Sequence, residues 1–294
     1  MIIIPKYIYK TAPTLHSLLE KLYLNTEKEN PGWKIKFYDD QGCINFLKEK
    51  FSNDNLNLKK DVLKSYNKLI PTAYKADLWR LCVIYEYGGV YSDASQIFKL
   101  PIDQIIDTTK EFCIIKDIPY YNKVKKNLIL FQGFQISLFS SVKKHPYLLK
   151  YIERINYNVH NSVYGLGTLS VTGPQLAYEI AYKYNFLKNI TIIGTQSSDI
   201  ECINNEGIVI VQKAEFHNKI VYGERSRYDE LWSKRNIYNL TDIEKKEQEE
   251  AKKEINADRK RPINKKKNKK KNKKKNKFKK KNNSRFNLGK FNFI

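Results

Sequence analysis

Short apolar runs alternate along this chain with segments whose apolar residues are spaced as on one face of a helix. Lys34–Tyr38 alternates charged and apolar residues, which predicts a strand, whereas Thr14–Leu24 spaces its leucines at helical intervals. Repeated switching between the two periods predicts an α/β fold with a mostly parallel sheet flanked by helices. The other predicted strands are Ile2–Tyr9, Val90–Asp93, Phe112–Ile115, Phe134–Phe139, Ile190–Ile193 and Ile208–Val211, and the other predicted helices are Asp39–Phe51, Asn55–Leu69, Ala73–Tyr87, Pro146–Asn158, one from Pro174, and Tyr228–Arg235.

The helix predicted at Ala73–Tyr87 is apolar nearly all round, because Trp79 lies outside the stripe to which Leu78 belongs. A helix of this kind is buried inside the protein. Gly88-Gly89 ends the helix, and the short strand that follows ends at Asp93. The pattern therefore predicts a buried helix that leads directly into a strand with a carboxylate at its end.

Asp93 is the first candidate for chemistry. It lies at the carboxyl end of a predicted strand, the edge at which open α/β sheets bind ligands. A carboxylate there suits Mg²⁺ or Mn²⁺, which prefer oxygen ligands. Such an ion would bridge the phosphates of a sugar nucleotide and neutralise the departing diphosphate. Because Asp is also common beside turns, a turn or helix cap is the alternative interpretation.

Two motifs in this stretch, Lys75-Ala76-Asp77-Leu78-Trp79-Arg80 and Tyr87-Gly88-Gly89-Val90-Tyr91-Ser92-Asp93, resemble the signature of glycosyltransferase family 32. These are DXD-motif sugar transferases, which include the initiating α-1,6-mannosyltransferase type. The resemblance spans roughly residues 2–236 and includes weaker pieces around Ile4–Tyr9, Pro31–Trp33 and Thr172–Pro174. It implies a GT-A fold with a Rossmann-like sheet, a UDP- or GDP-hexose donor, a Mn²⁺ or Mg²⁺ ion and retention of anomeric configuration.

The resemblance also implies roles for individual residues, carried over by position. Asp77 and Arg80 would hydrogen-bond the hydroxyls of the donor sugar; a local ion pair is the alternative, although charges on so apolar a helix need a partner. Tyr9 would stack on the nucleotide base and Tyr91 would flank the donor, with core packing as the alternative for both. Trp232 would close over the donor, or instead cap the last helix.

The sequence departs from the family at the second Asp of the DXD motif, where Ser95 stands. A Ser hydroxyl is a neutral and weaker metal ligand, so we expect another residue to compensate. His217 is the candidate, although a lone His is more often structural. The predicted sets are catalytic Asp93, Asp77 and Arg80; donor-binding Tyr9, Asp77, Arg80, Tyr91, Asp93 and Trp232; and metal-binding Asp93, Ser95 and His217.

The C-terminal part of the chain has a different composition. Residues 241–294 hold 22 Lys/Arg against 7 Asp/Glu, so they supply +15 of the net charge of +23. KKKN repeats three times over 265–276, a polar run that cannot bury a core. We therefore predict a glycosyltransferase domain at 1–240 and a low-complexity, disordered basic tail at 241–294. Such a tail is suited to contact nucleic acid or an anionic membrane, and a low-complexity tail without a dedicated partner is the alternative.

Metal-hydrolase and serine-hydrolase functions find no support in the sequence. It contains no P-loop, no GxGxxG, no GxSxG and no HExxH. The four cysteines form no CxxC pair, and neither a signal peptide nor a long apolar span is present. These features favour a reduced, cytoplasmic protein, in a viral or host cytoplasm.

The function predicted from the sequence is a metal-dependent, retaining hexosyltransferase that acts on a glycan, protein or lipid acceptor. Two alternatives stay open. One is a nucleic-acid-binding protein that acts through its basic tail. The other is a catalytically inactive homologue that binds sugar nucleotides, an interpretation that rests on Ser95.

Overall fold

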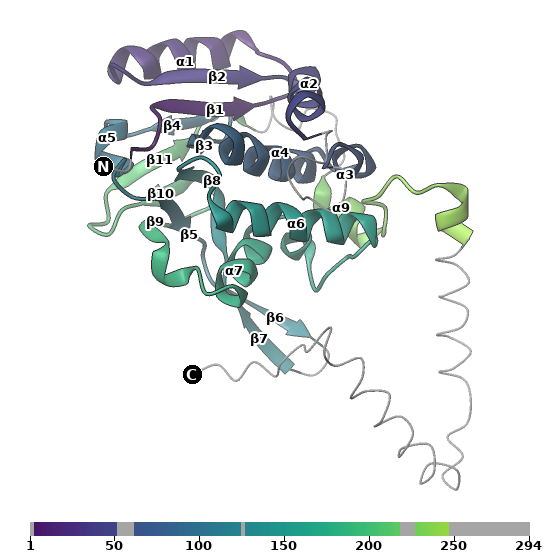
Figure 1. Ribbon diagram of the computed structural model, residues 1–294. Coiled ribbons are helices and arrows are strands. Elements are labelled where there is room, and N and C mark those ends of the chain that lie inside the picture. Colours follow the sequence, from purple (N-terminus) through teal and green to yellow (C-terminus); the bar gives the residue numbers. More distant parts are fainter. Residues whose placement is uncertain (1–2, 52–61, 125–126, 218–226, 247–294) are drawn as a thin grey trace, which may run out of the picture. The chain divides into compact units, whose positions relative to one another are not determined.

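The protein is described by a computed structural model that covers residues 3–51, 62–124, 127–217 and 227–246 (Figure 1). The chain divides into two compact units, Met1–Asn239 and Leu240–Ile294. In the second unit, the hydroxyl of Thr241 accepts from the backbone N–H of Glu244 at the start of a helical turn. The predicted disordered tail lies outside the described residues from 247 onwards, so it stays a prediction. No helix in the described ranges is long and apolar enough to span a membrane.

The first unit is a mixed α/β fold built on a nine-stranded sheet, in the order β2-β1-β3-β8-β5-β9-β10-β11-β4, with a separate hairpin of β6 and β7. The strands are β1 (Tyr7–Thr11), β2 (Lys34–Tyr38), β3 (Gly89–Ser92), β4 (Gln96–Phe98), β5 (Phe112–Lys116), β6 (Tyr120–Val124), β7 (Asn127–Phe131), β8 (Phe134–Ser141), β9 (Thr191–Gln196), β10 (Glu201–Ile203) and β11 (Val209–Lys213).

The prediction of a mostly parallel sheet is wrong. Among the described residues of the nine-stranded sheet, the pairs β1–β2, β1–β3 and β5–β9 are parallel and the other five pairs are antiparallel. Strands β9, β10 and β11 follow one another through short loops, which permit antiparallel but not parallel pairing. Strand β8 returns from the β6–β7 hairpin and inserts between β3 and β5 in the opposite direction.

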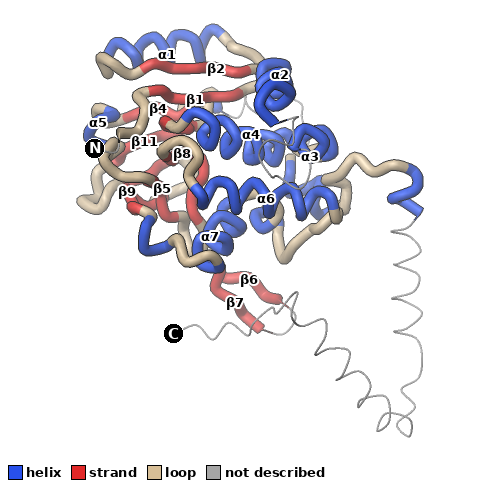
Figure 2. The backbone as a smooth tube through the Cα atoms, viewed as in Figure 1, coloured by secondary structure: helices blue, strands red, loops and turns tan. Residues whose placement is uncertain are grey.

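Helices cover the sheet, as Figure 2 shows. They are α1 (Ser17–Glu29), α2 (Asp40–Phe51), α3 (Val62–Lys68), α4 (Thr72–Tyr87), α5 (Ile102–Ile105), α6 (Pro146–His160), α7 (Pro174–Lys183) and α9 (Tyr228–Ser233), with short 3₁₀ turns at Thr168–Ser170 and Leu187–Asn189. Helix α4 contacts β1, β3 and β8, whereas α1 contacts β2 and β4. On β1, Tyr9 packs against Tyr87 of α4 and the next residue, Lys10, lies over Tyr23 of α1. Since neighbouring strand residues point to opposite faces, α4 and α1 cover opposite faces of the sheet at β1.

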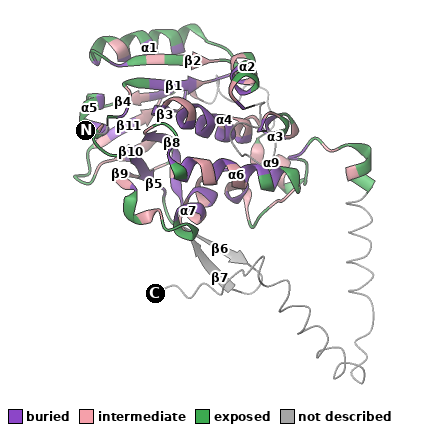
Figure 3. Ribbon diagram, in the orientation of Figure 1, coloured by how far each residue is buried: buried purple, intermediate pink, exposed green. Residues whose placement is uncertain are grey.

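Helix α4 is buried along nearly its whole length, as its apolar sequence predicted (Figure 3). It ends at Gly88, whose backbone N–H donates to the carbonyl of Ile84 at 2.8 Å. Gly88 and Gly89 have φ angles of 68° and 102°, in the left-handed region that favours glycine. A Cβ on Gly89 would lie 2.8 Å from the carbonyl oxygen of Tyr7. The glycine pair therefore lets the chain turn directly from α4 into β3, close against β1.

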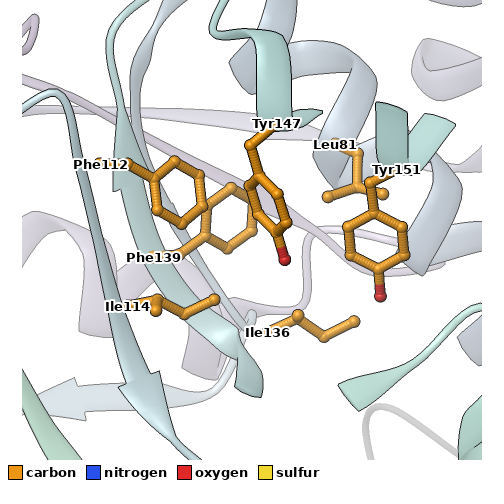
Figure 4. A pocket seen from close by; sticks show the side chains of 7 residues that line it. All are labelled: Leu81, Phe112, Ile114, Ile136, Phe139, Tyr147 and Tyr151. Atoms are coloured by element: carbon orange, nitrogen blue, oxygen red, sulfur yellow. The ribbon is translucent and has the colours of Figure 1, made fainter. Parts of the chain in front are cut away.

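A dense apolar layer joins α4 and α6 to the centre of the sheet (Figure 4). The space between its side chains is too small to hold a water molecule. This layer contacts α4 through Leu81, near the middle of the helix, and offers no room for a ligand. The residues that form it are Leu81, Phe112, Ile114, Ile136, Phe139, Tyr147 and Tyr151.

Candidate active site

Arg80 lies between two carboxylates that come from different elements. Its Nη2 is 3.3 Å from Oδ1 of Asp77 on the same helix, and its Nη1 is 3.3 Å from Oδ1 of Asp93 at the end of β3. Nη1 also donates to the carbonyl of Ile136 on β8 at 2.8 Å. The guanidinium is 8% exposed, so these contacts are made in a region of low dielectric, where charge pairing is strong.

One oxygen of the Asp93 carboxylate, Oδ1, contacts neighbouring side chains, whereas the side chain as a whole stays partly exposed. Tyr91 donates its phenolic hydrogen to Oδ1 of Asp93 at 2.9 Å, the same oxygen that Arg80 approaches. The guanidinium of Arg80 stacks over the ring of Tyr91, with 4.4 Å between Cζ and the ring centroid. The Asp93 side chain is 24% exposed. Since both contacts use Oδ1, Oδ2 is the oxygen available to a ligand.

Asp77 connects this group to the turn before α7. Thr172 donates its hydroxyl hydrogen to Oδ2 of Asp77 at 2.7 Å, across 95 residues of sequence. Burial raises the pKa of Asp77 above its ordinary value, while Arg80 and Thr172 act to lower it. The local ion pair proposed as an alternative for Asp77 and Arg80 is present, but it is part of a larger network that reaches Asp93.

Ser95 and His217 lie together at the far end of the Asp93 turn. Ser95 is fully buried and its Oγ is 2.5 Å from Nδ1 of His217. The backbone N–H of Ala214, just after β11, donates to the carbonyl of Ser95 and places this segment beside the turn. Burial lowers the pKa of His217, although Asp93 opposes the shift. Since the Ser95 contact uses Nδ1 of His217, a metal ion bound by this imidazole would be held through Nε2.

Tyr9 and Trp232 lie in packed surroundings. Tyr9 is 5% exposed and its ring stacks on Tyr87, with 6.0 Å between centroids. This is the core-facing alternative, and stacking on a nucleotide base stays a prediction without support from its position. Trp232, on α9, is partly buried and donates its indole N–H to the carbonyl of Tyr164 at 2.7 Å. Its contact with a donor also stays a prediction.

Sequence reasoning missed Lys10, a fully buried lysine on β1. Its Nζ donates to Oγ of Ser92 at 3.0 Å and to the carbonyl of Asp93 at 2.9 Å. Burial lowers the pKa of Lys10 to about 7, with Asp93 opposing the shift. The available signal was a lysine inside a strand pattern of β-branched and aromatic residues, a position where a charge needs a partner.

Asp93 and His217, which lie close enough to interact electrostatically, carry an oxygen and a nitrogen that could ligate a divalent ion. No group of three or more His, Cys, Asp or Glu side chains that could hold a metal occurs in the described ranges. Mg²⁺ and Mn²⁺ sites in nucleotide-binding enzymes commonly use one or two protein ligands, with phosphate oxygens and water completing the shell. The residues present therefore fit an ion that is bound together with a diphosphate.

Comparison with known proteins identifies the region that contains most of these residues. Residues 17–112 match the family described as the glycosyltransferase sugar-binding region containing the DXD motif. This region includes Asp77, Arg80, Asp93 and Ser95, whereas Lys10, His217 and Trp232 lie outside it. The predicted resemblance to a DXD-motif glycosyltransferase family is confirmed over these residues.

Two curated proteins are similar to part of the chain. An uncharacterized glycosyltransferase of Acanthamoeba polyphaga mimivirus is 34% identical over 89 residues, which are 30% of this chain and 32% of that protein. The initiation-specific alpha-1,6-mannosyltransferase of Candida albicans is 27% identical over 84 residues, 29% of this chain and 20% of that protein. The matches therefore span a third or less of either relative. The PaToxG glycosyltransferase structure aligns with 62% of this chain and 70% of its own, at 18% identity and a TM-score of 0.42.

Proposed function

We propose that this protein is a metal-dependent, retaining glycosyltransferase of the GT-A type. It moves a hexose from a nucleotide-sugar donor to a glycan, protein or lipid acceptor. The observation that carries this proposal is the network of Asp77, Arg80 and Asp93, in which two motifs of the sugar-binding region meet at the carboxyl end of β3. Ligands of α/β sheets bind at that edge.

In this proposal the donor lies over Asp93, with its diphosphate at the turn that leads to Ser95. Asp77 and Arg80 orient hydroxyls of the donor sugar, and their ion pair holds each of the two side chains in place. Tyr91 fixes Oδ1 of Asp93. Side chains held by several contacts lose little freedom when the donor binds, which favours precise positioning.

Asp93 and Nε2 of His217 would hold the divalent ion, and Ser95 would orient the imidazole of His217 through Nδ1. Once bound with the donor, the ion would neutralise negative charge on the departing diphosphate. Ser95 is fully buried and engaged by His217, so we assign it an orienting role in place of the direct ligation that the sequence suggested.

Transfer would proceed at C1 of the donor sugar. The bond between C1 and the diphosphate oxygen breaks, and the acceptor oxygen forms a bond to C1 on the same face. The acceptor proton passes to the leaving diphosphate. The protein's part is to hold the donor still and to stabilise the charge on the leaving group, which is the largest contribution in many transferases.

A thermal-shift screen of UDP- and GDP-hexoses, with and without Mn²⁺, tests the proposal. A ligand that binds only the native state raises the melting temperature. We expect a rise with one nucleotide class in the presence of Mn²⁺, followed by slow hydrolysis of that donor. Binding without any turnover would favour the inactive homologue, and no binding would contradict a donor site.

A second candidate function rests on the composition of the tail. Residues 265–282 contain 13 lysines, a density that attracts polyanions by counterion release. Removing residues 241–294 should abolish binding to nucleic acid or to anionic vesicles, and that binding should weaken steeply with salt. If the shortened protein still binds polyanions tightly, the basic surface lies in the folded unit instead.

A further inference from the structure

Lys10 lies beneath the turn that carries Asp93, on the face of the sheet opposite to α4. Its ammonium donates to Oγ of Ser92 and to the carbonyl of Asp93. Two aromatic rings lie beside this ammonium: the distance from Nζ to the ring centroid is 5.5 Å for Tyr23 and 5.7 Å for Phe98. The side chain has no exposed surface, so no ligand can touch it.

The turn is therefore held from both faces of the sheet. On the α4 side, Arg80 and Tyr91 contact the carboxylate of Asp93. On the other side, Lys10 holds the backbone of the same residue through its carbonyl. Gln96 closes the turn, because its Oε1 accepts from Ser92 and from the backbone N–H of Asp93. Fixing both the carboxylate and the backbone fixes the direction of Oδ2.

The fold does not need the charge of Lys10. If this side chain were apolar, Oγ of Ser92 would still donate to Gln96, and the carbonyl of Asp93 would still accept from the backbone N–H of Gln96 at 3.0 Å. Neither group would lose its last partner. A fully buried ammonium is itself costly, because burial separates the charge from water. Side chains that cost stability and satisfy no otherwise orphaned group are typical of functional sites.

We propose that Lys10 is a positioning residue of the donor site: it fixes the Ser92–Gln96 turn from beneath, so that Asp93 meets the metal ion and the diphosphate in one orientation. This inference rests on the proposed function. The inference goes beyond the proposed function, because it assigns part of the affinity for the metal ion and the diphosphate to a side chain that never contacts the ligand. Residues that orient a ligating group typically affect metal affinity on the order of 10- to 100-fold.

Calorimetric titration of the full chain with Mn²⁺ and either UDP or GDP tests the inference, with Lys10→Met as the main variant. We expect nucleotide affinity to fall on the order of 10-fold or more, while the melting temperature without ligand stays at or above that of the wild type. Lys36→Met, on the neighbouring strand β2 where the lysine is exposed, is the matched control and should bind as the wild type does.

Three outcomes would overturn the inference. Unchanged affinity in Lys10→Met would remove Lys10 from the site while leaving the proposed function intact. A drop in melting temperature that accompanies the loss of affinity would make Lys10 a structural residue only. If Lys10→Met does not fold, Ser92→Ala decides, because it removes the hydroxyl partner of Lys10, and wild-type affinity in that variant would contradict positioning. Absence of nucleotide binding in the wild type would instead overturn the proposed function itself.

Discussion

The guanidinium of Arg80 lies 3.3 Å from the carboxylate of Asp93, although one residue belongs to a helix and the other follows a strand. The same guanidinium contacts Asp77, so a single cation fixes two carboxylates at the carboxyl edge of the sheet. All three side chains are largely buried, which makes each of them dependent on the other two.

Replacing Arg80 should therefore damage stability as well as binding. Arg80→Ala leaves two carboxylates without their cation, and breaking a buried pair in this way costs about 3–5 kcal/mol. Urea denaturation measures the loss. Arg227→Ala is the control, because it removes an exposed ion pair with Asp229 that contributes no more than about 1 kcal/mol. Equal stability of the two variants would contradict the network described above.

Ser95 and His217 should act together in metal binding. Ser95→Ala removes the hydrogen bond to Nδ1 and should weaken Mn²⁺ binding in the presence of nucleotide on the order of 10-fold. His217→Ala should weaken it at least as much, and the double variant should be no worse than His217→Ala alone. Free Mn²⁺ measured by electron paramagnetic resonance gives these affinities. Additive losses in the double variant would show that Ser95 acts independently of His217.

The turn from α4 into β3 should tolerate no side chain. Gly89→Ala combines a positive φ with a Cβ 2.8 Å from the carbonyl of Tyr7, whereas Gly207→Ala meets the positive φ alone, with open space around it. Gly207→Ala should lower the free energy of unfolding by about 1–2 kcal/mol, and Gly89→Ala should lower it clearly more. Chemical denaturation of both variants tests this. A smaller loss for Gly89→Ala would mean that β1 and β3 separate easily.

Asp117 provides a test of pH dependence away from the site. Burial raises its pKa above the ordinary value, so the folded protein holds that proton more tightly than the unfolded chain does. Asp117 therefore stabilises the protein fully only below about pH 3.8, and this contribution is lost as the pH rises through the folded pKa. Asp117→Asn should raise the melting temperature at pH 7, and it should give no such rise below about pH 3.8.

The contribution of Asp107 to stability should depend on pH in the opposite direction to that of Asp117. Hydrogen bonds from Thr109 lower the pKa of Asp107, so its stabilisation is present above the ordinary pKa and is lost in acid. Asp107→Asn should accordingly lower the melting temperature at pH 7. Melting curves of both variants from pH 3 to pH 8 provide the comparison, and shifts of the same sign at pH 7 would contradict it.

The sequence predicted the buried helix, the glycine turn and the position of Asp93 correctly, because each depends on a local pattern. Thr72–Tyr87 and Gly89–Ser92 fall within two residues of the predicted elements. Strand order was not predictable in this way. The insertion of β8 between β3 and β5 and the antiparallel β9–β11 pairs depend on contacts between distant segments.

Those residues of the candidate site that belong to a sequence motif could be predicted. Asp77, Arg80 and Asp93 lie in motifs, and the structure brings them together. Thr172 belonged to a motif but had no predicted partner, because only tertiary packing places it against Asp77. Lys10 was missed because the alternation of residues in a strand does not show which residue a buried charge contacts. Its partner Ser92 lies 82 residues later in the sequence. The core position of Tyr9 likewise depends on packing against Tyr87.

The most direct test of the account compares the wild type with Asp93→Asn for Mn²⁺-dependent hydrolysis of UDP- and GDP-hexoses. Asn keeps the size of the side chain and an oxygen for Tyr91, but it removes the negative charge from the edge of the sheet. We expect the wild type to release hexose from one donor class only when Mn²⁺ is present, and Asp93→Asn to release none when assayed at a temperature at which it stays folded. Full hydrolysis by Asp93→Asn would contradict the account.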